Sequence, residues 1–283
     1  MSTENAGEIL AAWETSSHYW NKHQALIEQM YAPLSRTLIE EAKIDHGQRV
    51  LDIGGGSGEP SLTIAPLVGS SGSVTYTDPA AGMVRAAREE AKRRGLGNIQ
   101  FHQCSVEQIP FADGSFDVAV SRLSAMFFPD VSRGLHEVLR VVKPNGVVSF
   151  LVWAGKDVNP FFSVVTEILD RFVQAELEQE DAPTAFRFAA PGKLAKLLQQ
   201  AGAISVTERA FEFSIEAPIT VEQFWELRTE MSDTFRNKLG RLVPDQVAAI
   251  KYTVQKKMAS YFKTGAMVIP GQVLLVTGRK PEK

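Results

Sequence analysis

The chain alternates short apolar runs with segments in which apolar residues recur at helical spacing. The apolar runs predict strands, and spacings such as that of Leu34, Leu38 and Ala42 predict amphipathic helices. The predicted strands are Val50–Ile53, Ser73–Thr77, Asn98–His102, Phe116–Ser121, Val147–Trp153, Ser205–Ile215 and Gln272–Lys280. The predicted helices cover residues 8–45, 80–94, 131–142, 160–178, 191–201 and 220–262, with another after Pro60, and Lys143–Gly146 predicts a turn.

Strands that alternate with helices are typical of a doubly wound, mostly parallel sheet. We therefore predict a Rossmann-like α/β fold with a seven-stranded sheet and a helical cap. Residues 1–46 are expected to form an N-terminal helical lid, and residues 220–263 an inserted helical cap. Residues 47–219 and 264–283 then form the sheet domain, whose carboxyl edge is where such folds bind ligands.

Composition excludes several classes of protein. Hydrophobic residues make up 44% of the 283 positions and charged residues 22%, which are globular values. The net charge of −3 gives no general attraction to nucleic acid or anionic membrane. The longest strongly apolar run, Val147–Ala154, is too short to span a bilayer. The single cysteine, Cys104, excludes an internal disulfide, and a cytoplasmic location is expected.

A glycine-rich loop follows the first predicted strand. Its spacing is Gly54-x-Gly56-x-Gly58, which differs from the G-x-G-x-x-G pattern of dinucleotide sites. Asp52 lies inside the strand just before the loop, where a carboxylate would repel a pyrophosphate. The same carboxylate suits a ligand that carries a positive amino group, such as S-adenosylmethionine.

Asp78 ends the second predicted strand, 20 residues after Gly58. A carboxylate at that place can accept hydrogen bonds from a ribose diol, which indicates a nucleoside without identifying the cofactor. Met83 begins the next helix and is placed either to cover an adenine or to fill the core.

Four stretches between residues 48 and 155 together resemble a known family. They are VLDIGGGSG, TDPAAGMVRAARE, SVEQIPFADGSFDVAVSR and PDVSRGLHEVLRVVKPNGVV. They are similar to class I S-adenosylmethionine-dependent methyltransferases of the ubiquinone/menaquinone-biosynthesis type (methyltransferase type 11). The resemblance implies S-adenosylmethionine as the cofactor, S-adenosylhomocysteine as its product, and no metal.

The resemblance also implies a role for individual positions. Asp52 and the loop glycines match the surroundings of the methionine part, Asp78 the ribose carboxylate, and Pro79 with Met83 the neighbours of the adenine. Ser105 and Val106 match the adenine edge, and Ser121 with Arg122 the strand end beside the transferable methyl. The cofactor-binding residues expected in this way, with Trp20 added from the lid, are Asp52, Gly54, Gly55, Gly56, Gly58, Asp78, Pro79, Met83, Ser105, Val106, Ser121, Arg122 and Trp20.

The sequence departs from the family at a few of these positions. The family usually has an acidic residue where Ser105 stands and often a cysteine where Gly55 stands. Histidines are frequent in the family where this chain has Phe127 and Phe128. Two phenylalanines make that wall of the site apolar, which argues against a histidine-based mechanism from this loop.

Methyl transfer from a sulfonium mainly needs alignment of the reactants and exclusion of water. A general base would help a hydroxyl or carbon-acid acceptor. The aromatic-rich segment Trp13–His23 supplies the candidates, with His18 and Tyr19 as predicted catalytic residues and His23 as a weaker one. The alternative is that these side chains only pack on the sheet or face solvent.

The aromatic residues available to line the acceptor site favour a hydrophobic or aromatic small molecule. Oxygen, carbon and nitrogen all stay open as the attacking atom. An RNA or protein methyltransferase is the second hypothesis, supported by Arg85, Arg88 and the run Lys92–Arg94, although Glu89 and Glu90 interleave with them. A relative that holds the cofactor without transferring methyl, and a dehydrogenase, are the others. The pattern sets no oligomeric state.

Overall fold

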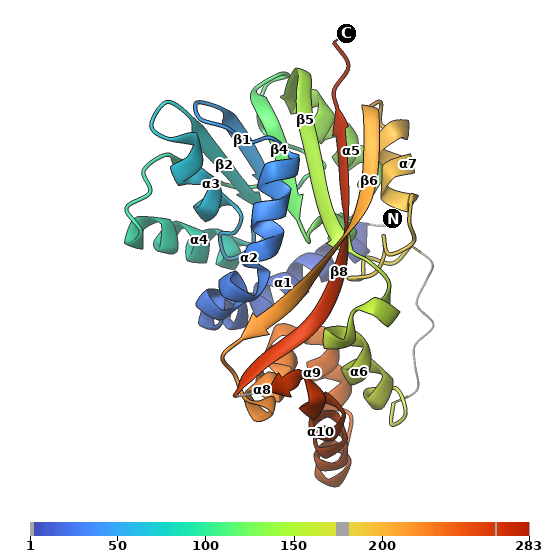
Figure 1. Cartoon of the computed structure of the whole chain (residues 1–283). Helices are drawn as coiled ribbons and strands as arrows, with labels where there is room; N and C mark the ends of the chain where they lie inside the picture. Colours follow the sequence, from blue (N-terminus) through green and yellow to red (C-terminus); the bar gives the residue numbers. More distant parts are fainter. Residues whose placement is uncertain (1–2, 174–180, 264, 283) are drawn as a thin grey trace.

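One twisted sheet runs through the molecule and confirms the predicted α/β fold (Figure 1). The computed structural model describes residues 3–173, 181–263 and 265–282. In these residues the sheet order is β3-β2-β1-β4-β5-β8-β6, with the short β7 paired to β8. The strands are β1 (Arg49–Ile53), β2 (Ser73–Asp78), β3 (Ile99–Gln103), β4 (Phe116–Arg122), β5 (Val142–Trp153), β6 (Ile204–Ala217), β7 (Phe262–Lys263) and β8 (Ala266–Arg279). The first five strands pair in parallel, while β8 runs antiparallel to β5 and to β6.

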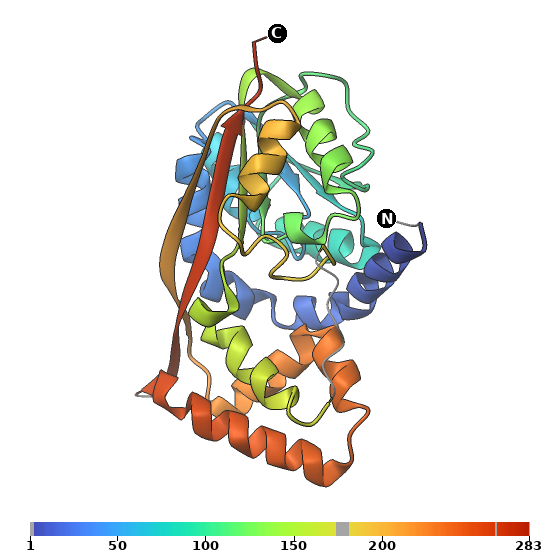
Figure 2. The same cartoon turned by 90° about the vertical axis from the view of Figure 1, so that its right-hand side faces the viewer.

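Helices cover both faces of this sheet and its carboxyl edge. The N-terminal α2 packs on one face against β4, β5 and β6, and α5 and α7 lie on the opposite face (Figures 1 and 2). The helices are α1 (Thr3–Lys22), α2 (Gln24–Glu41), α3 (Ser61–Val68), α4 (Ala81–Arg93), α5 (Val131–Val141), α6 (Pro160–Leu169), α7 (Lys193–Gln200), α8 (Val221–Met231), α9 (Asp233–Leu239) and α10 (Pro244–Met258). None of the helices among the described residues is long and apolar enough to cross a membrane.

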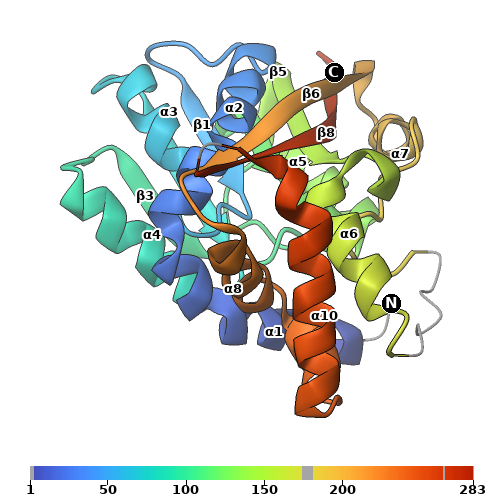
Figure 3. The ribbon, with the colours of Figure 1, turned by 60° about the horizontal axis from the view of Figure 1, so that its bottom comes forward.

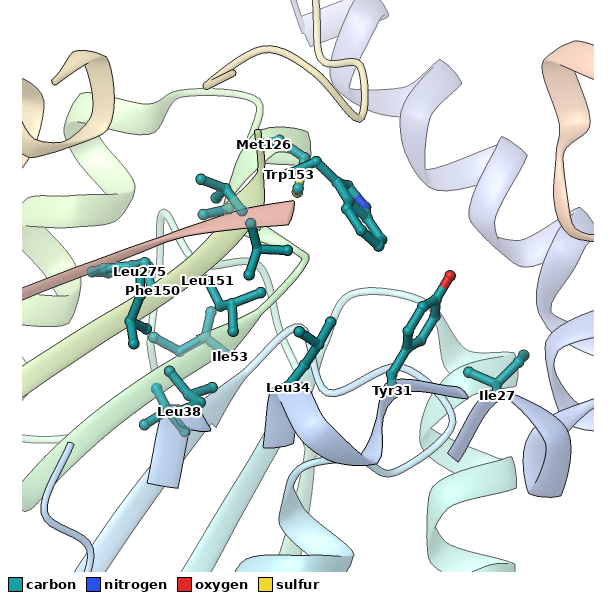
Figure 4. Packing of buried hydrophobic residues seen from close by; sticks show 14 of the residues in the cluster. Ile27, Tyr31, Leu34, Leu38, Ile53, Met126, Phe150, Leu151, Trp153 and Leu275 are labelled. Atoms are coloured by element: carbon teal, nitrogen blue, oxygen red, sulfur yellow. The ribbon is translucent and has the colours of Figure 1, made fainter. Parts of the chain in front are cut away.

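The main core lies between α2 and the central strands. Ile27, Tyr31, Leu34 and Leu38 are buried on one side of α2, where their spacing of three or four residues places them on a single face. Figure 4 shows this row facing side chains of β5 and β8, among them Trp153. Burying one such aliphatic or aromatic side chain stabilises the fold by about 1.5–3 kcal/mol. Helix α2 is therefore part of the core of the sheet and not only a cover.

Some element boundaries differ from the sequence prediction. The expected helix 8–45 is interrupted at His23, which separates α1 from α2. The expected helix 220–262 is divided after Met231, where the Ser232 hydroxyl accepts the Phe235 N–H and starts α9. Strand β5 begins at Val142, so the predicted turn Lys143–Gly146 is a bulge within the strand.

The hairpin of β6 and β8 extends past the sheet and carries α8, α9 and α10 between its strands. Its ladder runs from Ile204–Arg279 to Ala217–Met267, which is longer than either predicted strand. Figure 3 shows α1, α8 and α10 together beyond the carboxyl edge of the sheet. Part of the predicted helix 160–178 lies outside the described residues, and the division of the chain into lid, sheet domain and cap stays a prediction.

Helix α1 is attached to the sheet domain through the start of α4. The Glu14 carboxylate accepts the N–H groups of Ala81, at 2.6 Å, and of Gly82, at 2.9 Å. These are free N–H groups of the first helical turn, where a negative charge is favourable. Gly82 permits the close approach, because a Cβ there would lie only 2.2 Å from the Ser17 hydroxyl.

Glu14→Ala should release α1 from α4 without unfolding the sheet. Loss of the two hydrogen bonds from the α4 N-terminus to Glu14 is expected to lower the free energy of unfolding by about 1–2 kcal/mol. Amide exchange should accelerate in α1 and stay slow in β1 and β4. Glu8→Ala, at an exposed position of the same helix, is the control. Equal exchange in both variants would show that Glu14 does not hold α1.

Candidate functional site

A cavity of about 540 Å³ lies at the carboxyl ends of β1, β2 and β4, and α1 and α2 form part of its wall. This is where doubly wound sheets bind ligands, and the volume is that of a small-molecule site. The described residues that line it are Gly7, Ile9, Leu10, Trp13, Trp20, Ile27, Tyr31, Ile53, Gly54, Gly55, Gly56, Ser57, Glu59, Thr77, Asp78, Pro79, Met83, Cys104, Ser105, Val106, Glu107, Arg122, Leu123, Ser124, Phe127, Phe128, Pro129, Asp130 and Arg133.

The glycine loop forms the floor of the cavity and is held by β2. Gly54, Gly56 and Gly58 have φ values of 65°, 54° and 123°, which side chains rarely adopt. The Tyr76 hydroxyl donates to the Gly56 carbonyl at 2.5 Å, and the Gly56 N–H donates to Asp78 Oδ2 at 3.0 Å. The loop is thus fixed before any ligand binds.

Gly55 is required by the tyrosine beside it. A Cβ at Gly55 would lie 2.5 Å from the Tyr76 ring and 2.8 Å from Asp52 Oδ2. The Tyr76 ring therefore fills the space that a cysteine would need at this position, which accounts for the departure from the related sequences.

Asp52 is fully buried below the loop and does not line the cavity. Its Oδ2 accepts the Ser61 hydroxyl at 2.6 Å and the Ser61 N–H at 3.1 Å, whereas Oδ1 has no hydrogen-bond partner among the described residues. Burial raises the pKa of Asp52 to about 7, against the lowering effect of Ser61 and Arg122.

Asp78 lines the cavity at the end of β2. Its Oδ1 accepts the Ala80 N–H at 2.9 Å, so both carboxylate oxygens have a backbone donor. Burial raises the pKa of Asp78 to about 6, while the bonds from Ala80 and Gly56 lower it. This buried carboxylate lines the cavity and has further lone pairs that can accept hydroxyl groups from a ligand.

Ser105 is hydrogen-bonded to a neighbouring carboxylate, that of Glu107. The Ser105 hydroxyl donates to Glu107 Oε2, and Glu107 Oε1 accepts the Asp130 N–H at 2.9 Å. Ser105, Val106 and Glu107 all line the cavity. An acidic side chain is therefore present here after all, two residues further along the chain than expected.

The end of β4 supplies a cation. Arg122 lines the cavity, and its Nη1 donates to the Ser35 hydroxyl at 2.7 Å and to the Tyr31 carbonyl at 3.4 Å. Burial lowers the pKa of Arg122, and the nearby carboxylates of Glu59 and Asp52 oppose this. Ser121 is buried and does not line the cavity, because its hydroxyl bonds Ser124 at 2.6 Å.

Aromatic side chains of α1 and of the segment after β4 form part of the cavity wall. The Trp13 ring lies edge-on to those of Trp20 and Phe127, at centroid distances of 5.7 and 5.0 Å. The Trp20 Nε1 is buried without a hydrogen-bond partner among the described residues. Phe128 also lines the cavity, so the two phenylalanines of this loop contribute to an apolar wall.

The three candidate bases from the lid segment are not brought to the cavity. His18 is exposed, and its Nδ1 donates to the Thr15 carbonyl of its own helix at 2.9 Å. Tyr19 packs under the Arg236 guanidinium at 4.6 Å. His23 Nε2 lies 2.5 Å from Glu230 Oε2 on α8. Their assignment as bases therefore has no geometric support.

Sequence prediction missed several lining residues, among them Tyr31 and Glu107. Tyr31 follows the helical spacing of core residues, and nothing in that spacing shows that its hydroxyl reaches a cavity. Glu107 carried a weak signal, since an acid close to Ser105 can replace one at Ser105 itself. Gly58 lies outside the lining set, whereas Pro79 and Met83 belong to it.

Comparison with known proteins finds a matching family and several similar proteins. Residues 51–150 match a family described as a methyltransferase domain. The chain is 39% identical to the ubiquinone/menaquinone biosynthesis C-methyltransferase of Cellvibrio japonicus over 112 residues, which cover 39% of this chain and 45% of that one. It is 29% identical to nocamycin O-methyltransferase of Saccharothrix syringae over 264 residues, which cover 89% and 92%.

A solved structure supports the fold. The YcgJ protein of Bacillus subtilis is similar with a TM-score of 0.56 and 19% identity, covering 88% of this chain and 98% of that one. A likeness at this identity shows the fold alone. The chain is also 31% identical over 146 residues to uncharacterised proteins of Mycobacterium bovis and Mycobacterium tuberculosis. The match spans 52% of the length of those relatives.

Asp52→Asn should stabilise the protein at alkaline pH. The folded pKa of about 7 exceeds that of an unfolded aspartate, so the stability that goes with the protonated form is lost as pH rises through that value. Urea unfolding should show a stabilising effect of the substitution at about pH 8 that shrinks at about pH 5. Asp113→Asn, at an exposed side chain, is the control. A destabilised variant at both pH values would contradict the argument.

Proposed function

Because the chain belongs to the class I S-adenosylmethionine-dependent methyltransferase family, we propose that it transfers a methyl group from S-adenosylmethionine to an apolar or aromatic small molecule. The observation that carries the proposal is the cavity itself. It combines a bare glycine loop and a ribose-type carboxylate at one side with an aromatic wall at the other.

The residues present fit this cofactor. Gly54 and Gly56 leave backbone exposed where the methionine part would lie, and a positive amino group there would favour the charged form of the buried Asp52, whose Oδ1 has no partner among the described residues. Asp78 would hold the ribose, and Pro79 with Met83 would contact the adenine. Ser105, Val106 and Glu107 would address the adenine edge, with Glu107 as the stronger acceptor for its amino group.

The bound cofactor supplies a methyl group on a sulfonium. Transfer forms a bond between the acceptor and the methyl carbon and breaks the bond between that carbon and sulfur. The electron pair of the broken bond stays on sulfur, which gives S-adenosylhomocysteine. The chain's own residues then have two tasks. Trp13, Trp20 and Phe127 exclude water and orient the acceptor. The fixed glycine loop keeps the donor side from moving, so that the reacting atoms stay aligned.

An apolar small molecule is favoured over a polymer as the acceptor. The named small-molecule methyltransferases among the relatives point the same way. Two of the five basic residues that would suit RNA are already paired with carboxylates, since Arg93 bonds Glu90 and Arg94 bonds both Glu90 and Glu28. Pairing of this kind is typical of a solvated helix surface.

Asp78→Ala should weaken cofactor binding while the fold persists. Each charge-assisted hydrogen bond lost costs about 1.5–3 kcal/mol, so the dissociation constant for S-adenosylmethionine should rise at least about tenfold in calorimetry. Transfer of labelled methyl from S-adenosylmethionine into the small molecules of a cell extract should fall in parallel.

Asp113→Ala is the matched control, because it removes an aspartate from the surface. Unchanged affinity in Asp78→Ala would reject the assignment of the ribose site. Tight binding of S-adenosylmethionine without any labelled product would favour a relative that holds the cofactor without transferring methyl. Label in RNA or protein would favour the polymer hypothesis.

Glu107→Gln and Ser105→Ala separate the two side chains at the adenine edge. If Glu107 accepts the adenine amino group, its neutralisation should weaken S-adenosylmethionine binding by about 1.5–3 kcal/mol, and Ser105→Ala by about 0.5–1.5 kcal/mol. Calorimetry with S-adenosylmethionine measures both. A larger effect of Ser105→Ala would assign the contact to the serine, and no effect in either variant would place the adenine elsewhere.

A further inference from the structure

Arg228 on α8 is a buried cation without a carboxylate. The residue is 6% exposed, its Nε has no hydrogen-bond partner among the described residues, and no ion pair involves it there. Its guanidinium lies over the rings of Phe161 and Phe162, at 4.8 and 4.9 Å from their centroids. Burial lowers the pKa of Arg228 to about 10, which still leaves it charged at neutral pH.

The charge of Arg228 acts on the cavity through Tyr31. Tyr31 lines the cavity, and burial lowers the pKa of Arg228 while the nearby Tyr31 opposes this lowering. Figure 4 shows Tyr31 on α2 beside Trp153 of β5, and their ring centroids are 5.8 Å apart. Trp153 in turn packs on Phe162, one of the two rings under the guanidinium. Arg228 does not itself line the cavity, but this series of ring contacts connects it to Tyr31, which does.

Two cations act on the Tyr31 hydroxyl from different elements. Burial raises the pKa of Tyr31 to about 12, and Arg228 from α8 and Arg122 from β4 oppose this rise. Tyr31 is therefore neutral at physiological pH and keeps its proton as a hydrogen-bond donor. No hydrogen bond of this hydroxyl to another described residue is present, so it is available to a ligand.

The carboxylates near Arg122 offset part of its charge but do not act on Arg228. Glu59, Asp52 and Glu28 raise the pKa of Arg122 from the glycine loop, β1 and α2, and none of them shifts the pKa of Arg228. An uncompensated buried charge is costly, and folded proteins normally pair it. Stacking on two phenylalanines offsets part of that cost. An anion in the cavity would offset more, because it would meet a hydroxyl donor with two cations around it.

We propose that Tyr31, Arg122 and Arg228 form an oxyanion-recognition site, and that the acceptor is an aromatic or apolar molecule with an acidic oxygen that binds as its anion. The proposal rests on the proposed function and deepens it by naming the acceptor class: a carboxylic acid, an enol or an acidic phenol. Tyr31 donates to the oxygen, Arg122 borders it, and Arg228 is a positioning residue that favours the charged form.

Binding of the anion removes the need for a base in the lid. The acceptor's proton has gone to solvent before or during binding, and the oxygen's electron pair forms the new bond to the methyl carbon. The carbon–sulfur pair remains on sulfur, so an anion and a sulfonium give two neutral products. This agrees with the absence of His18, His23 and Tyr19 from the cavity lining.

A matched pair of dyes tests the anion preference without knowledge of the natural acceptor. 1-Anilinonaphthalene-8-sulfonate and N-phenyl-1-naphthylamine share their ring system, and only the first carries a negative charge. Fluorescence titration of the protein loaded with S-adenosylhomocysteine should show tighter binding of the anionic dye. Arg228→Met should weaken the anionic dye about tenfold and leave the neutral dye unchanged.

Companion variants separate recognition from folding. Tyr31→Phe should lower the preference for the anionic dye at constant volume, and Arg228→Lys should retain most of it. Arg209 lies on the edge strand β6 and pairs with Glu41 of α2, so Arg209→Met should leave the binding of both dyes unchanged. The urea midpoint of Arg228→Met should stay equal or rise, since an apolar replacement of a buried charge is commonly neutral or stabilising.

Several outcomes would overturn the proposal. They are equal binding of the two dyes by the native protein, no binding of either dye, and equal loss of both dyes in Arg228→Met. A fall in stability with an unchanged dye preference would make Arg228 a structural residue only. Calorimetric binding of S-adenosylhomocysteine is measured separately, so its failure would reject the proposed function, whereas failure of the dye preference alone would reject only the acceptor class.

Discussion

The attachment of the glycine loop to β2 is the constraint on which the site depends. Gly56 is held from both sides, by the Tyr76 hydroxyl at its carbonyl and by the Asp78 carboxylate at its N–H. Both residues are on the strand next to β1, so the parallel pairing of the two strands sets the height of the loop. The sheet therefore fixes the floor of the cavity, and a ligand that binds there does not have to pay the entropy of ordering the glycine loop.

Helix α2 connects this floor to the acceptor side. Its inner face is core, with Leu34 and Leu38 fully buried, yet Tyr31 and Ile27, one and two turns before Leu34, line the cavity. At its start, Gln24 donates to the Ser57 carbonyl in the glycine loop at 2.5 Å. The same helix thus contributes to stability, to the support of the glycine loop and to the cavity wall. Only substitutions that change few atoms, such as Tyr31→Phe, will test one of these roles without disturbing the others.

The alternation of strands and helices, and the glycine loop with a carboxylate at the edge of the sheet, could be predicted from sequence because local signals determine them. The glycine spacing and Asp78 at the strand end act within a few residues of the chain. The acceptor side could not, because it depends on contacts between segments remote in sequence. Arg228 meets Phe161 and lies near Tyr31 only through the cap, and its spacing in α8 resembles that of any amphipathic helix. Likewise, the sequence presents His23 as a candidate base, because its pairing with Glu230 joins two helices that are remote in sequence.

Gly55 and Tyr76 have a consequence for how such a site diverges. Because the ring occupies the space of a side chain at position 55, neither residue can be exchanged freely while the other stays. A cysteine at position 55 would require a smaller residue at position 76, and that loss would also remove the hydroxyl that holds Gly56. The two positions behave as one inherited unit, so lineages should carry either the glycine with its tyrosine or the cysteine with a different support for the loop.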